Sequence, residues 1–238
     1  MTTIGFFGDS FCADFENRHS IDHEYETYIK KLKNHYNADI VNMGVAGSNV
    51  WDPILLQFKP FENNPPDIAI FVWTHIANIF HRECRNLQYF NMTNPALMSS
   101  LYKPNATMMA ANQFFEHLFD IEKVTVEYLA ALMYFDDTVL SKLNNTKIIH
   151  MWGFGKTDFD TTVPEKDELY DNVISYPYTW KHGVELRPAL MAYAYGEQYG
   201  EKIADILKKD KRANHIGGNE LNEKIFNLIK TAIDSSSQ

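Results

Sequence analysis

The sequence has few cysteines, no excess of basic residues and no long hydrophobic run. Only two of its 238 residues are cysteine, Cys12 and Cys84, which excludes the multi-disulfide framework of small secreted domains. The formal net charge of -9 opposes binding to phosphate backbones over the surface as a whole. No apolar run approaches the roughly 20 residues that span a bilayer. We therefore expect a protein of the reducing cytoplasm that binds neither nucleic acid nor membrane.

The composition that remains is typical of a folded globular protein. Hydrophobic residues make up 45% and charged residues 22%, unlike a disordered chain. A chain of this length is sufficient for one domain with a full core, and no linker or repeat divides it. We expect a single domain over residues 1–238.

Short apolar runs alternate with stretches of helical periodicity along the chain. The predicted strands are 3–7, 39–42, 67–73 and 147–152. The predicted helices are 25–36, 53–58, 110–143 as one helix or two, 186–208 and 220–233. This alternation predicts an α/β protein whose parallel sheet is covered by helices on both faces. The stretch of about 153–185 has no clean period, and we expect an irregular loop insertion over one sheet edge.

Small and polar residues follow three of the predicted strands. Gly8-Asp9-Ser10 follows the first, residues 42–48 follow the second, and Trp73-Thr74-His75 follows the third. Ligands of parallel sheets bind at the carboxyl ends of the strands, so these residues are candidates for one site. Gly-Asp-Ser alone is also a common turn, in which Ser10 would only cap a helix. A histidine, His215, precedes the last predicted helix.

Taken in order, these motifs resemble those of the SGNH (GDSL-type) serine hydrolases. Gly8-Asp9-Ser10-Phe11 looks like the nucleophile block of that family, Gly47 like its glycine, and His215 like its C-terminal histidine. The resemblance implies a flavodoxin-like, three-layer α/β/α fold. It also implies hydrolysis of a small carboxylic ester, an acylated sugar being one such substrate, without a cofactor or metal.

The catalytic roles that the resemblance implies are consistent with serine chemistry. Ser10 is the expected nucleophile, and His215 is the base that takes its proton and returns it to the leaving alcohol. The backbone N–H groups of Ser10 and Gly47 are expected to face the developing oxyanion. The family places an asparagine amide as a third donor, where this chain has Thr74. We expect the Thr74 hydroxyl to replace it, with His75 and Asn78 as alternatives.

The residue three positions before the histidine also departs from the family pattern. The family has an aspartate there that orients the imidazole, whereas this chain has Arg212. A neighbouring positive charge lowers the pKa of a histidine and so disfavours the imidazolium. Three alternatives follow: Asp210 replaces the aspartate, a backbone carbonyl holds His215 in a Ser-His dyad, or the site is inactive. In the last case the chain would be a binding or structural module.

Other functions are favoured less by the sequence. A nucleotide-binding protein of flavodoxin-like fold is disfavoured because Gly153-Phe154-Gly155-Lys156 lacks the spacing of a phosphate-binding loop. His75, His81 and Cys84 lie close in sequence but form no known zinc-binding motif, so we expect no metal.

Aromatic residues gather in and beside the predicted loop insertion. They are Trp152, Phe154, Tyr176, Tyr178 and Trp180. Such a cluster could stack against a sugar or cover the edge of the sheet, and we favour the cover.

Overall fold

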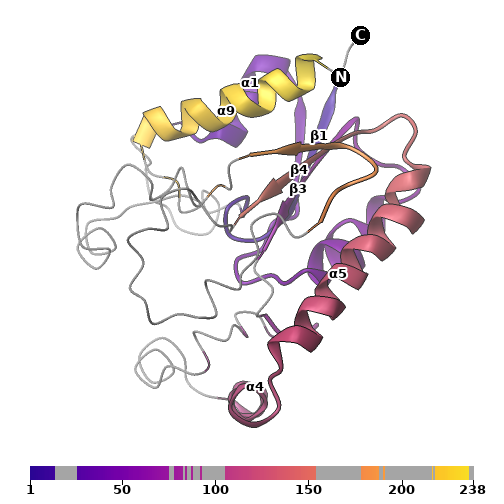
Figure 1. Ribbon diagram of the computed structural model, residues 1–238. Coiled ribbons are helices and arrows are strands. Elements are labelled where there is room, and N and C mark those ends of the chain that lie inside the picture. The colour runs from indigo at the N-terminus through magenta and orange to yellow at the C-terminus, as the bar shows by residue number, and fades with distance from the viewer. Residues whose placement is uncertain are drawn as a thin grey trace.

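The chain forms a parallel sheet with helices on both of its faces (Figure 1). The computed structural model describes residues 1–13, 26–74, 78–82, 84, 87, 92, 105–153, 178–187, 190, 216 and 218–235. The five strands of the described residues lie in the order β2-β1-β3-β4-β5, and every neighbouring pair is parallel. This is the flavodoxin-like strand order. The predicted three-layer α/β architecture is confirmed.

Four of the five described strands were predicted, and one was not. The strands are β1 (Thr3–Gly8), β2 (Asp39–Asn42), β3 (Ile68–Trp73), β4 (Lys147–Trp152) and β5 (Val184–Leu186). The fifth strand corrects the prediction of a loop that continues to residue 185 and of a helix that begins at 186. A strand of three residues is too short to show the alternating hydrophobic pattern of a strand. It forms because β5 pairs with β4, where Val184 lies opposite Ile149 and Leu186 opposite Met151. The middle of the predicted loop, 154–177, lies outside the described residues.

The described helices lie in or directly next to the predicted segments. Of the predicted helix 186–208, only residues 186, 187 and 190 are described, so that prediction lies almost wholly outside the described residues. They are α1 (Tyr28–Tyr36), α4 (Ala106–His117), α5 (Ile121–Thr138) and α9 (Gly218–Ser235), with short helical turns η1 (Pro53–Gln57), η2 (Lys59–Phe61) and η3 (Leu140–Lys142). The 110–143 segment forms two helices because Asp120 accepts a hydrogen bond from the Lys123 N–H and so starts α5 afresh. No described helix is both long and apolar enough to cross a membrane.

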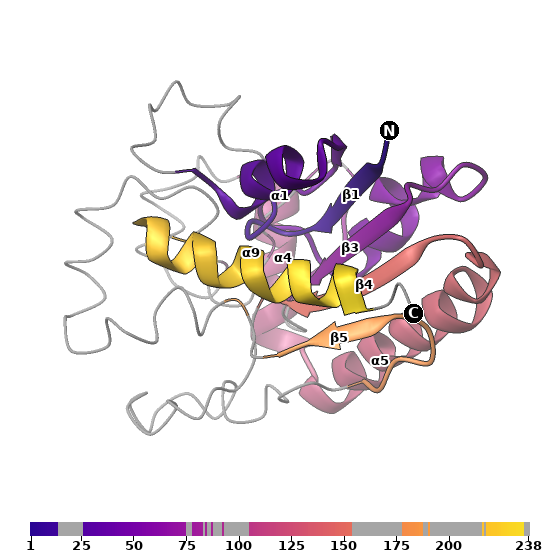
Figure 2. The same cartoon turned by 90° about the horizontal axis from the view of Figure 1, so that it is seen from above.

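Helices α1 and α9 lie side by side on one face of the sheet (Figure 2). Lys31 Nζ lies 2.8 Å from Glu223 Oε2, and the Tyr36 hydroxyl donates to Asp234 Oδ1 at 2.9 Å. Alternate strand residues face these helices, as the period of two requires. The core between them includes Ile4, Phe6, Tyr28, Leu32, Ile68, Ile70, Val72, Ile149, Met151, Leu221, Ile225 and Ile229.

Helix α5 and the turn η1 cover the opposite face (Figure 1). This core is rich in aromatic rings, which pack largely edge to face. The ring centroids of Phe71 and Phe135 lie 5.1 Å apart, and those of Phe7 and Phe58 lie 5.0 Å apart. The two separate cores hold the strand ends in fixed positions.

A buried carboxylate fastens the segment before β5 to α5. Asp136 accepts hydrogen bonds from the Lys181 N–H at 2.8 Å and the Tyr178 hydroxyl at 3.0 Å, and these bonds help to hold its pKa below the ordinary value. Trp180 then stacks on His150 at a centroid distance of 3.6 Å. In the described part of the aromatic cluster, these side chains cover the sheet rather than stand free. Phe154 and Tyr176 lie outside the described residues.

We predict that Gly8→Ala destabilises the protein more than Gly5→Ala does in the same strand. A Cβ on Gly8 would lie 2.1 Å from the carbonyl oxygen of Val72, and the φ of Gly8 is 151°. That oxygen belongs to a paired strand and has no freedom to move, so we expect a loss of about 3 kcal/mol or more. A Cβ on Gly5 meets only the ends of the Phe7 and Pro66 side chains. Urea unfolding of both variants tests this order, and equal losses would contradict it.

Candidate active site

The predicted nucleophile, Ser10, lies in a tight turn at the carboxyl end of β1. The carbonyl oxygen of Asp9 accepts hydrogen bonds from the N–H groups of Cys12 (3.2 Å) and Ala13 (3.0 Å). The Asp9 carboxylate itself accepts from the Phe11 N–H at 2.9 Å. Ser10 is 8% exposed, so little of the residue is accessible to solvent. Within the described part of the chain, no residue hydrogen-bonds to its hydroxyl.

The loop after β2, which carries Gly47, packs against this turn. The Val45 N–H donates to the carbonyl oxygen of Gly8 at 3.0 Å. The Asn42 amide donates to the carbonyl oxygen of Cys12 at 2.8 Å. Gly47 has a φ of 76°, a left-handed conformation that favours glycine because it has no Cβ. The Ser10 turn and the Gly47 loop, which the sequence assigned to one site, thus contact each other in the structure.

Gln57 joins the same two segments, and sequence reasoning missed it. Its amide oxygen accepts from the Gly8 N–H at 2.5 Å, and its amide nitrogen donates to the Gly8 carbonyl at 2.9 Å. The same nitrogen donates to the Ser48 hydroxyl at 3.0 Å. The one signal in the sequence was a polar residue within the apolar segment 53–58.

Thr74 follows β3 and lies beside Asp9. Its carbonyl oxygen accepts from the Tyr128 hydroxyl at 2.7 Å, and its own hydroxyl accepts from the Asn78 amide at 3.4 Å. The Asn78 amide also donates to the Ser48 carbonyl at 3.2 Å. Thr74 and Asn78, two of the three candidates for the third oxyanion donor, therefore lie next to each other, and both already hydrogen-bond to other protein groups. The other alternative, His75, lies outside the described residues.

Asp9 is a buried carboxyl group directly before Ser10. Burial raises the pKa of Asp9 to about 7, although hydrogen bonds from the Phe11 N–H and the Thr74 side chain act in the opposite direction. Its second oxygen, Oδ2, lies against Gly153, where a Cβ would come within 2.8 Å of it. In the structure as described, that oxygen has no hydrogen-bond partner. The carboxyl is thus close to half ionised near neutral pH.

The predicted base and its possible partner, His215 and Asp210, lie outside the described residues, as does Arg212. The helix that follows them is described. Tyr28 connects it to the serine turn, since its N–H donates to Asn222 Oδ1 at 2.8 Å and its hydroxyl donates to the Phe11 carbonyl at 2.9 Å. A single residue, Tyr28, therefore bridges the first turns of α9 and the Ser10 turn in space.

The histidine and cysteine residues considered as metal ligands are only partly described. The N–H of Cys84 donates to His81 Nδ1 at 3.0 Å. Within the described ranges, no group of three histidine, cysteine or acidic residues is arranged to hold a metal ion.

Comparisons with known proteins gave matches in structure only. No protein-family model and no curated protein sequence matches the chain. Similar solved structures include a psychrotrophic esterase from Pseudoalteromonas sp. (12% identity, 98% of this chain and 100% of that chain, TM-score 0.48). An acetylxylan esterase from Geobacillus stearothermophilus (13%, 98% and 94%, TM-score 0.48) and another acetyl xylan esterase (14%, 97% and 99%, TM-score 0.47) are also similar. All three of these proteins are described as esterases.

We predict that Asp9→Asn removes a pH-dependent loss of stability. The folded-state pKa lies above the ordinary value of 3.8, so the native state binds more protons and the wild type loses stability as the pH rises from about 4 to about 7. Asparagine keeps the oxygen that accepts from Phe11 but cannot ionise. The unfolding free energy of the variant relative to wild type should therefore rise by up to about 4 kcal/mol between pH 4 and pH 8. Urea titrations at several pH values measure it, and parallel curves would contradict a buried, ionising Asp9.

Proposed function

We propose that the chain is a serine esterase in which Ser10 attacks a carboxylic ester and His215 acts as the base. The observation that carries this proposal is the Gly8-Asp9-Ser10 turn at the end of β1, fastened to the Gly47 loop by the bond from the Val45 N–H to the Gly8 carbonyl. The turn lies at the β1/β3 switch point of the sheet. Ligands of flavodoxin-like folds bind at such a point.

The proposed reaction uses the groups around this turn in sequence. His215 removes the hydroxyl proton of Ser10 as its oxygen attacks the ester carbonyl, and a tetrahedral oxyanion forms. The backbone N–H groups of Ser10 and Gly47 donate to that oxyanion, with Thr74 as the proposed third donor. His215 then gives its proton to the leaving alcohol, and water hydrolyses the acyl-serine by the same steps.

The link through Tyr28 supports the assignment of His215. Tyr28 contacts both the Phe11 carbonyl, next to Ser10, and Asn222 in the early part of α9. His215 lies three positions before the start of α9 in the sequence, and Ile216 is buried in the same hydrophobic core as Phe11. A histidine at this position in the chain is therefore consistent with a base that serves Ser10.

We favour a Ser10–His215 dyad whose imidazole is held by a backbone carbonyl. The alternative is a displaced triad through Asp210, the only carboxylate within five residues before the histidine. Asp210 would have to reach two residues further than the family aspartate. Lys211 and Arg212 would also compete for its charge, which is why we favour the dyad.

The substrate is a small carboxylic ester, and an acylated carbohydrate is one candidate. A second candidate function is a binding module of the same fold. Thr74 in place of an asparagine and Arg212 in place of an aspartate are the two observations that favour it.

We predict that Ser10→Ala abolishes hydrolysis of p-nitrophenyl acetate and labelling by a fluorophosphonate. Removal of the nucleophile should lower kcat by at least about 1000-fold, because the oxyanion donors alone retain little catalysis. Ser141→Ala is the matched control, since its hydroxyl donates only to the Asp137 carbonyl in an exposed turn. Activity that survives in Ser10→Ala would refute the nucleophile, and an inert wild type would favour the binding module.

We predict that Asp210→Asn costs less than about tenfold in kcat, because a charge that does not touch the imidazole changes the barrier little. Replacing a true triad aspartate by asparagine costs about 10⁴-fold through the wrong histidine tautomer. Asp39→Asn, at an exposed position at the start of β2, gives the baseline for losing one surface charge. A steep loss in Asp210→Asn, with an unchanged melting curve, would establish the displaced triad instead.

A further inference from the structure

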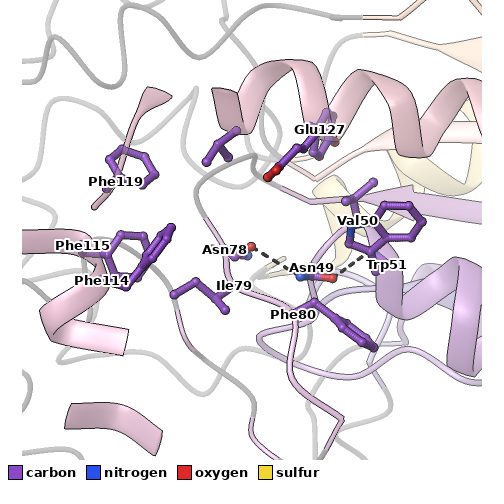
Figure 3. Close-up of a pocket in the computed structure, with 12 residues that line it drawn as sticks. Asn49, Val50, Trp51, Asn78, Ile79, Phe80, Phe114, Phe115, Phe119 and Glu127 are labelled. Carbon is purple, nitrogen blue, oxygen red and sulfur yellow. Dashed lines mark hydrogen bonds between the residues drawn. The ribbon is translucent and has the colours of Figure 1, made fainter. Parts of the chain in front are cut away.

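A pocket of about 220 Å³ opens beside the candidate active site, between helices α4 and α5 and the segments after β2 and β3 (Figure 3). Its walls are mostly aromatic and aliphatic, with a polar side at Asn49 and Asn78. The described residues that line it are Asn49, Val50, Trp51, Asn78, Ile79, Phe80, Phe114, Phe115, Phe119, Val124, Glu127 and Tyr128. We call it the aromatic pocket.

Three of the lining residues connect the aromatic pocket to the candidate active site. Asn49 is two residues from Gly47, so their Cα atoms are at most about 7.6 Å apart. The Asn78 amide donates to the Thr74 hydroxyl at 3.4 Å, and the Tyr128 hydroxyl donates to the Thr74 carbonyl at 2.7 Å. Two residues of the pocket wall, Asn78 and Tyr128, thus contact Thr74, the proposed third oxyanion donor.

The polar groups of the aromatic pocket are largely engaged with the protein itself. Asn78 uses its amide nitrogen on the Ser48 carbonyl and the Thr74 hydroxyl. Asn49 donates to the Asn78 carbonyl at 3.4 Å and accepts from the Trp51 N–H at 2.8 Å (Figure 3). Glu127 pairs with Lys123 at 2.9 Å. Burying a sugar here would cost its hydroxyls their bonds to water, whereas an apolar group gives up none.

The size of the aromatic pocket limits what it can hold. An apolar cavity of about 150 Å³ lined by aliphatic and aromatic side chains admits benzene. A pocket of about 220 Å³ therefore has room for a phenyl ring or a short alkyl chain.

We infer that the aromatic pocket binds an apolar group of the ester substrate, of the size of a phenyl ring or a short alkyl chain. The inference rests on the proposed esterase function and specifies its substrate class. It makes the preferred substrate larger and more apolar than an acetyl ester of a simple alcohol. The apolar group belongs either to the acyl part or to the alcohol part of the ester, and the experiment separates these two sources.

Two valines of the same helix make a matched pair of variants. Val124 lines the aromatic pocket, and Val124→Trp should fill it from the α5 side. Val126 is 65% exposed on the same helix and is not among the lining residues, so Val126→Trp adds the same side chain outside. Should Val124→Trp fail to fold, Phe119→Ala enlarges the pocket instead and should shift the preference toward longer chains.

The kinetic test compares kcat/KM within two ester series. The acyl arm uses p-nitrophenyl acetate and hexanoate, and the alcohol arm uses ethyl and benzyl acetate, each rate divided by that of hydroxide hydrolysis. In wild type, the larger ester of one arm should be preferred at least about tenfold, since each well-fitted methylene is worth roughly tenfold or more. Val124→Trp should lower that ratio at least about tenfold, and Val126→Trp should leave it unchanged. Equal ratios in the two variants would overturn the inference.

A binding measurement separates failure of the pocket from failure of the proposed function. Acetophenone carries a phenyl group but cannot be hydrolysed, and calorimetry measures its binding to the Ser10→Ala protein. Binding that is lost when Val124→Trp is added, but retained with Val126→Trp, supports the pocket even if wild type cleaves no ester. Absence of binding, or equal binding in both double variants, overturns the inference even if wild type is an active esterase.

Discussion

The close pairing of β1 with β3 at Gly8 is the constraint on which the candidate site depends. The Val72 carbonyl comes so near that no side chain fits at Gly8. Both backbone groups of Gly8 are bonded to Gln57, and its carbonyl also accepts from the Val45 N–H. One residue thus joins three segments of the chain. The position of Ser10, two residues later, follows from this junction rather than from contacts of its own side chain.

Among the described titratable groups around the serine turn, Asp9 is the one that burial brings to a pKa near neutral pH. Burial, together with the nearby Asp9, raises the pKa of the Cys12 thiol and of the Tyr28 and Tyr128 hydroxyls, so all three stay neutral. Neutral hydroxyls can donate hydrogen bonds, and both tyrosines donate to backbone carbonyls of this corner. The tyrosines therefore act as fixed braces between the helices and the strand ends.

The parts of the fold that were predicted from sequence share a local signal. The strands β1, β3 and β4 are short apolar runs, and the candidate residues Ser10 and Gly47 were found because they follow strand ends. β5 could not be predicted, because three residues carry no period and the strand forms only through its partner. Gln57 and Tyr28 were also missed, since they are recognisable only by what they contact: Gly8 lies 49 residues from Gln57, and Phe11 lies 17 residues from Tyr28.

Two electrostatic requirements oppose each other at this corner if Ser10 attacks an ester. A water-poor site strengthens the hydrogen bonds that stabilise an oxyanion, but it equally strengthens repulsion by a neighbouring carboxylate. Asp9 directly precedes Ser10, so its protonated form suits the reaction better than its ionised form. The proposed base, His215, must by contrast be neutral to accept a proton, which higher pH favours. The burial that raises the pKa of Asp9 to about 7 therefore leaves part of the Asp9 carboxyl neutral near pH 7, where an ordinary histidine is already mostly uncharged.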